Sequence, residues 1–169
     1  TPDWIGEEDQ GAAFYGSWVS GAGDVDGDGF SDVVVGAYLW DDAFENEGAA
    51  FVYHGSNTGL SPTFNWMGVG GQGWANYGFG CSTAGDVNAD GYSDLIVGAY
   101  LYNNDQVDEG RGFVYHGTDS GLSPVANWTA ESNQELVGSY PPYYGLYVST
   151  AGDVNNDGYS DVIVGAQFY

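Results

Sequence analysis

The stretch GDVNADGYSD, residues 85–94, places four oxygen-bearing side chains at alternate positions around one glycine. These side chains are Asp86, Asn88, Asp90 and Asp94. Carboxylates so close in sequence repel one another, and a bound cation offsets that repulsion. The stretch therefore predicts a metal-binding loop, and its surroundings must show whether the metal serves catalysis or architecture.

The same loop occurs three times in the chain. It is GDVDGDGFSD from Gly23 and GDVNNDGYSD from Gly152, so the first aspartates of the three loops are separated by 62 and then 67 residues. FVYHG also recurs, at Phe51 and Phe113, and the longer second interval contains about five residues inserted around NQELVGSYPP, 133–142. Self-similarity at a fixed period indicates a repeat architecture. The repeats fall at residues 1–61, 62–123 and 124–169, and the last is incomplete.

Each repeat contains four segments that are typical of strands. They lie around PDWIG, FNWMG or ANWTA, then from a Tyr-Gly pair through SWVSGAG and its counterparts, then at SDVVVGAY, and last at AAFVYHG. Apolar triplets such as Val33–Val35 do not alternate with polar residues, which is typical of strands buried on both faces. An all-β fold built of four-stranded antiparallel β-propeller blades is therefore expected.

The number of blades is too small for a closed ring. Propellers contain roughly four to eight blades, and this chain has fewer than three. Thr1–Gly6 is similar to the outermost strand of one blade, whereas Gly152–Tyr169 corresponds to the inner strands of another. The chain is expected to be a partial propeller, completed either by the remaining blades of a longer chain or by other copies of itself through unlike surfaces.

The loops suit calcium better than other metals. Side-chain oxygens at positions 1, 3, 5 and 9, with the backbone carbonyl of position 7, approach the six to eight oxygen ligands that calcium takes, whereas magnesium prefers a strict octahedron and zinc prefers His or Cys. An EF-hand would need a Glu at position 12, where Val35, Val97 and Val164 stand. Simple Asp/Asn-Gly hairpin turns are the alternative, and threefold recurrence favours metal. Three calcium ions are expected, on Asp24, Asp26, Asp28, Asp32 and the carbonyl of Phe30; on Asp86, Asn88, Asp90, Asp94 and the carbonyl of Tyr92; and on Asp153, Asn155, Asp157, Asp161 and the carbonyl of Tyr159.

Charge excludes several classes of partner. The chain has 24 acidic residues and one basic residue, Arg111, for a formal charge of −23. Nucleic acids and anionic membranes both need Lys or Arg, so neither is expected as a partner. No apolar run reaches the length of a membrane span and Thr1 does not open a signal peptide, which is compatible with a mature secreted segment. Asn127-Trp128-Thr129 matches the N-glycosylation pattern.

Residues for catalysis are scarce. His54 and His116 lie one repeat apart, so they occupy equivalent places rather than facing each other, and a structural role at strand ends is expected. No nucleophile elbow or zinc-protease motif is present, and a calcium-bound carboxylate is a poor general base. Cys81, the only cysteine, takes the place of Val19 and Val148 and is expected to be a small buried hydrophobe. The chain is therefore not expected to be an enzyme.

The Tyr-Gly pair, the GDV(D/N)xDGxSD loop and the following VGAY together resemble the FG-GAP repeat of integrin α-subunit propellers and their bacterial relatives. The resemblance covers nearly the whole chain, with Tyr-Gly in place of Phe-Gly and Gly-Ala-Tyr or Gly-Ala-Gln in place of Gly-Ala-Pro. It implies a seven-bladed propeller with calcium in the hairpin between the first two strands of each blade. It also implies ligand contacts on the opposite face, which includes WDDAFENEG and YNNDQVDEG.

Two functions follow from this resemblance. The first is a calcium-binding extracellular propeller module, secreted or at the cell surface, that serves adhesion or structural assembly with a protein or glycan ligand. The alternative is an accessory or carbohydrate-binding domain of a larger secreted enzyme or lectin. Aromatic residues in or near the connections between blades could stack on sugar rings or pack within the blades; these are Trp74, Tyr140, Tyr143 and Tyr144.

Overall fold

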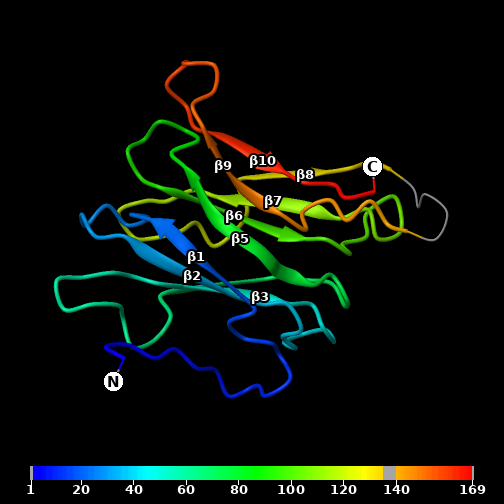
Figure 1. Cartoon of the computed structure of the whole chain (residues 1–169), viewed down its shortest axis with the longest axis horizontal. Coiled ribbons are helices and arrows are strands. Elements are labelled where there is room, and N and C mark those ends of the chain that lie inside the picture. The colour runs from blue at the N-terminus through cyan, green and yellow to red at the C-terminus, as the bar shows by residue number, and fades with distance from the viewer. Residues whose placement is uncertain (1, 135–139, 169) are drawn as a thin grey trace.

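The computed structural model describes residues 2–134 and 140–168, and within them it is all-β, with no helix. It contains two four-stranded antiparallel sheets and one two-stranded sheet (Figure 1), which confirms the predicted partial propeller. The first sheet has the order β1 (Trp18–Gly23), β2 (Asp32–Ala37), β3 (Ala49–Tyr53), β4 (Trp66–Val69). The second has the order β5 (Tyr77–Gly85), β6 (Asp94–Ala99), β7 (Arg111–Tyr115), β8 (Trp128–Glu131), and the third pairs β9 (Val148–Gly152) with β10 (Asp161–Val164).

The sheets are offset from the sequence repeats. Strand β4 comes from the start of the repeat 62–123, yet it pairs with β3 and completes the first sheet. In the same way β8 pairs with β7 and completes the second sheet. The outer strand of each complete blade therefore comes from the following sequence repeat. This arrangement links successive blades.

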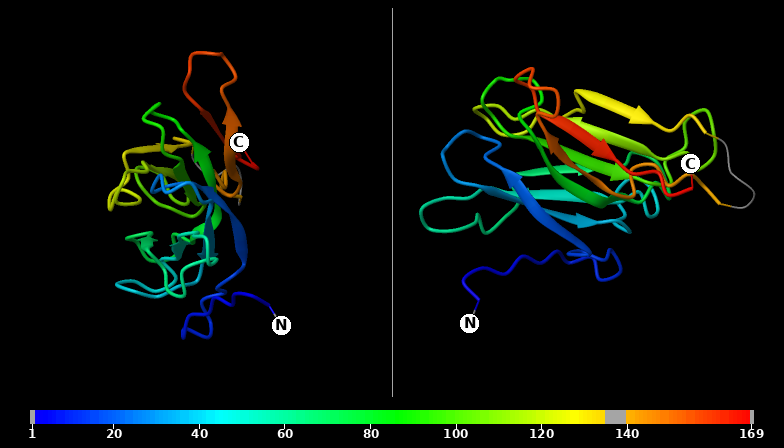
Figure 2. Two further views of the ribbon diagram at one scale, coloured as in Figure 1. Left: turned by 90° about the vertical axis from the view of Figure 1, so that its left-hand side faces the viewer. Right: turned by 45° about the horizontal axis from the view of Figure 1, so that its top comes forward.

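Apolar side chains hold the sheets face to face (Figure 2). Between the first two sheets, Val34 and Val52 lie in one cluster with Cys81, Leu95 and Val97. A smaller cluster lies between the second and third sheets, and its buried members are Ala84, Ile96, Val114 and Val148. Strands β2 and β6 are thus covered on both faces, as their unbroken apolar runs predict.

Strand β10 departs from that prediction. Ile163 is 60% exposed, whereas its counterparts Val34 and Ile96 are fully buried. The reason is physical: no further sheet of the described chain packs on this side of β10. The third blade therefore presents an uncovered apolar face.

The segment around PDWIG was expected to be a strand, and this is wrong. No strand is assigned there because no strand within the described residues lies beside it to share hydrogen bonds. The Trp4 indole still occupies a fixed place, donating to the Ser61 carbonyl at 2.9 Å and packing edge-on against Tyr53. The segment runs along the outer side of the first sheet (Figure 2) and covers it.

Two of the strands predicted to start at a Tyr-Gly pair begin later. The glycines of the three pairs, Gly16, Gly78 and Gly145, have positive φ of 81°, 82° and 86°, which interrupts the ladder at this point. Strand β5 keeps one pair ahead of its glycine, that of Tyr77 with Ala99, and resumes at Gly80, whereas β1 and β9 begin only after theirs. The inserted residues 135–139 lie outside the described residues.

The only cysteine, Cys81, is buried, and the only basic residue, Arg111, is paired with an acidic residue. Cys81 is a buried free thiol, and burial raises its pKa well above the usual range. The Arg111 guanidinium lies 2.8 Å from a Glu131 carboxylate oxygen across β7 and β8, and 4.6 Å from the centre of the Tyr102 ring. The single basic residue therefore fixes the outer edge of the second sheet.

None of the described segments forms a helix that is long and apolar enough to cross a membrane.

Candidate metal centre

The three acidic loops each join the first two strands of a sheet. Loop 24–32 connects β1 to β2, loop 86–94 connects β5 to β6, and loop 153–161 connects β9 to β10. Figure 1 shows them in succession along one side of the molecule, because the three sheets stack in the same orientation. The fold therefore repeats one local site at the same end of every blade.

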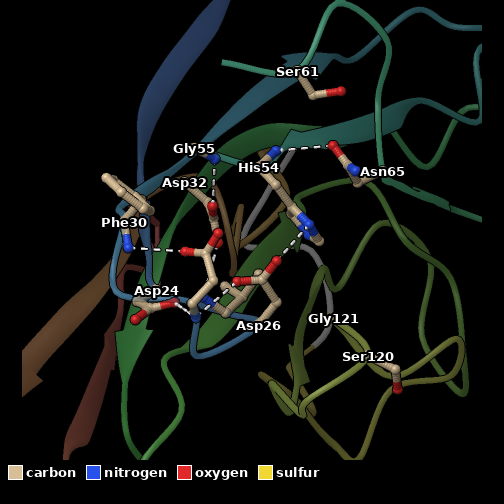
Figure 3. A network of polar contacts seen from close by, with 12 residues as sticks. Asp24, Asp26, Phe30, Asp32, His54, Gly55, Ser61, Asn65, Ser120 and Gly121 are labelled. Carbon is tan, nitrogen blue, oxygen red and sulfur yellow. Dashed lines mark hydrogen bonds and ion pairs between the residues drawn. The ribbon is translucent and has the colours of Figure 1, made fainter. Parts of the chain in front are cut away.

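Loop 24–32 gathers three carboxylates. One carboxylate oxygen from each of Asp24, Asp26 and Asp28 lies within 4.8 Å of the others. Backbone amides shape the loop: the amide of Asp28 donates to Asp24 Oδ1 at 3.1 Å, and that of Gly29 donates to Asp24 Oδ2 at 2.9 Å. Gly29, at φ 91°, supplies the turn that a residue with a side chain would resist. The sequence motif is therefore a preformed acidic cradle (Figure 3).

The aspartates at position nine are buried beneath the loops. Asp32 is 1% exposed and accepts the amides of Val25 and Gly55, both at 2.8 Å. Asp94 is fully buried and accepts the amides of Val87 and Gly117. Burial raises the pKa of both carboxyl groups, and the amide hydrogen bonds oppose that rise. Asp32 lies outside the group of three converging carboxylates. Its hydrogen bonds to the amides of Val25 and Gly55 stabilise the base of the hairpin.

The second and third loops repeat this arrangement with an amide at position three. The side-chain amide of Asn88 donates to Asp90 Oδ2 at 2.8 Å, and that of Asn155 donates to Asp157 Oδ2 at 2.9 Å. Exposed Asp153 has a lowered pKa, chiefly because its carboxylate accepts the Gly158 amide. The two loops therefore carry one negative charge less than loop 24–32.

His54 has a contact that was not predicted. Its Nδ1 lies 2.8 Å from Asp26 Oδ2, so the imidazole touches one of the predicted ligands, as Figure 3 shows. Its backbone amide donates to Asn65 Oδ1, and the equivalent amide of His116 donates to Asn127 Oδ1. The strand-end position agrees with the prediction, but the contact with Asp26 was not predicted, because it depends on loop 24–32 having Asp where the other loops have Asn.

The donor set fits a hard divalent cation. In loop 24–32 three carboxylates converge, and calcium prefers such oxygen ligands. Acidic side chains at this spacing repel one another, and a cation would relieve that repulsion. Occupancy and ligand identity at all three loops remain predictions.

At the opposite end of the blades two buried glutamates organise the connecting loops. Glu47 Oε1 accepts the amides of Asp42, Ala43 and Phe44, and its Oε2 accepts the amide of Gly71 at 3.0 Å. Glu109 repeats the first set of bonds with residues 104–106. Sequence reasoning missed both residues, although their separation by the repeat length was a usable signal.

The aromatic residues predicted for sugar stacking have unlike surroundings. Trp74 and Tyr140 are 55% and 58% exposed, whereas Tyr144 is half-buried. Tyr143 belongs to a row of rings whose neighbouring centres lie 4.9 to 5.5 Å apart. The row crosses all three blades and consists of Phe14, Tyr38, Phe79, Tyr100, Tyr143 and Phe168. Two of the four predicted residues therefore remain open to a ligand.

Comparison with known proteins agrees with the architecture. The FG-GAP repeat model matches residues 15–53, 82–116 and 146–169, which is more than half of the chain. Integrin alpha-PS2 of Drosophila melanogaster is 35% identical over 85% of this chain, and integrin alpha-6 of Homo sapiens is 30% identical over 85%. The aligned region spans only 11% and 12% of those relatives. The chain belongs to the FG-GAP repeat family, and integrin α subunits are among its relatives.

Proposed function

We propose that the chain is a calcium-binding part of an extracellular β-propeller that serves adhesion or structural assembly. Calcium would bind the three hairpins and rigidify them, and it would take no part in catalysis. The observation that carries the proposal is the convergence of Asp24, Asp26 and Asp28 in a hairpin that the fold repeats at each blade. Its place would be secreted or at the cell surface, where millimolar calcium suffices for weak sites.

Calcium stoichiometry tests this proposal. Elemental analysis of protein dialysed to equilibrium against calcium well above the expected dissociation constant, corrected for the free ion in the dialysate, together with titration calorimetry, should give three ions per chain. Replacing both Asp24 and Asp28 with alanine should remove one ion and leave the other two. Exposed Asp119, which lies outside the loops, provides the control: Asp119→Asn should leave all three. Fewer than two bound ions in the unmodified protein would contradict the proposal.

Completion of the propeller by other blades is the second part of the proposal. Between the first two blades, segment 116–123 of the second blade fills the space beside β4. The Thr118 amide donates to the Val25 carbonyl, and the Trp66 indole donates to the Ser123 carbonyl. The equivalent space beside β8 is a groove of about 430 Å³ lined by residues including Val87 and Trp128. Trp128 is 45% exposed, whereas Trp66 is 9% exposed. A further blade, from a longer chain or another copy, would cover this groove.

A carbohydrate-binding role within a larger secreted protein is the alternative. The observation that favours it is the exposure of Trp74 and Tyr140, which lie outside the acidic loops. Glycan arrays probed with the protein and with Trp74→Ala would decide between the two roles. Glycan binding that disappears in Trp74→Ala would support the alternative, whereas capture of extracellular matrix proteins alone would support adhesion.

A further inference from the structure

Successive acidic loops touch each other through one serine. Ser93 belongs to loop 86–94, yet its backbone amide donates to the Asp24 carbonyl at 2.9 Å. In return the Asp24 amide donates to the Ser93 hydroxyl oxygen at 3.2 Å. Asp24 is the first predicted ligand of the preceding loop, so both of its backbone polar groups are held by the next blade.

The contact depends on a glycine beside it. A Cβ on Gly23 would overlap the Ser93 hydroxyl, and a Cβ on Gly85 would overlap the Ser160 hydroxyl in the same way. The Ser160 amide also donates to the Asp86 carbonyl, at 2.8 Å. The bond from the serine amide to an aspartate carbonyl, and the closeness of the serine hydroxyl to a glycine, therefore recur at both junctions between blades within the described residues. Gly152, the third glycine of the set, has nothing within 4 Å of an added Cβ.

Two other contacts hold loop 24–32 from the same direction. The Val25 carbonyl accepts the Thr118 amide at 3.1 Å. The ring of Tyr92 lies directly against Gly27, where it leaves no room for a side chain. Loop 24–32 is thus shaped by the second blade as well as by its own hydrogen bonds.

We propose that Ser93 is a positioning residue for the calcium site in loop 24–32, and that Ser160 holds loop 86–94 in a similar way through the bond from its amide to the Asp86 carbonyl. The affinity of each calcium site then depends on the blade that follows it. This inference rests on the proposed calcium binding. Its physical basis is preorganisation: a loop whose backbone is already fixed at the first ligand loses less conformational freedom when it closes on a cation.

Hydrogen exchange measured by mass spectrometry during a calcium titration tests the inference, because peptides from each loop report a separate midpoint. Ser93→Ala should raise the midpoint of loop 24–32 by about fivefold, the effect of losing one neutral hydrogen bond. The midpoint of its own loop, 86–94, should not change. Ser31 stands at the same place in the first loop and is exposed, with no preceding loop in the described chain. Ser31→Ala is therefore the matched control and should shift nothing.

A pair of glycine variants provides a second measurement if Ser93→Ala folds poorly. Gly23→Ala and Gly152→Ala carry similar backbone strain, at φ 83° and 69°, but only the first displaces a serine. Gly23→Ala should therefore weaken its loop more than Gly152→Ala weakens loop 153–161. Equal effects, or a Ser93→Ala shift confined to loop 86–94, would overturn the inference and leave calcium binding intact. If calcium protects no loop of the unmodified protein, both proposals fail.

Discussion

At the scale of single residues, Asp26 is the side chain that distinguishes the first loop from the other two. It adds a carboxylate where Asn88 and Asn155 carry amides, and calcium affinity rises with the number of charged ligands. Asp26→Asn should therefore weaken calcium binding at loop 24–32 by roughly tenfold, toward the affinity of loop 86–94. Titration calorimetry would measure the change.

The converse variant is the control for that prediction. Asn88→Asp should strengthen loop 86–94 by a similar factor, because it restores the fourth carboxylate. The His54 imidazole lies 2.8 Å from Asp26, and this contact is not repeated between His116 and Asn88 within the described residues. Affinities that do not respond to either substitution would show that charge number does not set the order of the sites.

At the scale of structural elements, the loop between β2 and β3 depends on Glu47. Its fully buried carboxylate accepts four backbone amides, and these would lose their acceptor in Glu47→Ala. We expect the free energy of unfolding to fall by about 3 kcal/mol, because hydrogen bonds to a buried carboxylate are among the stronger ones. Urea unfolding would measure it.

Glu45 supplies the comparison for Glu47, since its side chain is exposed in the same loop. Glu45→Ala should change the free energy of unfolding by less than about 0.5 kcal/mol, as is usual for surface substitutions. If the two variants lose the same stability, the hydrogen bonds of Glu47 do not hold the loop.

The sequence predicted most of the elements, but not the contacts between them. The alternating oxygens of GDVNADGYSD located each hairpin, and the apolar triplets located β2 and β6, because both signals are local. The junction of Ser93 with Asp24 joins residues 69 apart, and the four bonds of Glu47 depend on a loop conformation that no periodicity encodes. The segment PDWIG, residues 2–6, is not a strand for the same reason, since a strand requires a neighbour that its own sequence does not specify.

At the scale of the whole molecule, calcium should stabilise the folded chain. A site with a dissociation constant near 10⁻³ to 10⁻⁴ M adds about 1 kcal/mol at millimolar calcium, so three sites add about 3 kcal/mol. For a chain of 169 residues this corresponds to a rise of roughly 6–12 °C in melting temperature. Scanning calorimetry in calcium and in EDTA would measure it, and identical transitions would contradict a structural role for the metal.

The uncovered face of the third blade leads to a second prediction at this scale. Ile163 and Val154 are 60% and 72% exposed where Val34 and Val25 are fully buried. The isolated chain should therefore self-associate in calcium, and Ile163→Glu should reduce the association. Light scattering would measure it, with Val125→Glu as a control on an exposed residue outside this face. A monodisperse monomer before substitution would exclude association through this surface.

The position of Arg111 allows trypsin cleavage to report local unfolding of strand β7. Trypsin cleaves after Lys or Arg, and this chain offers it a single bond, after residue 111. That bond lies in β7, where the guanidinium is held by Glu131 and the Tyr102 ring, so the protease must wait until the strand detaches. Digestion can yield only fragments 1–111 and 112–169. The rate at which they appear measures how often strand β7 separates from the second sheet.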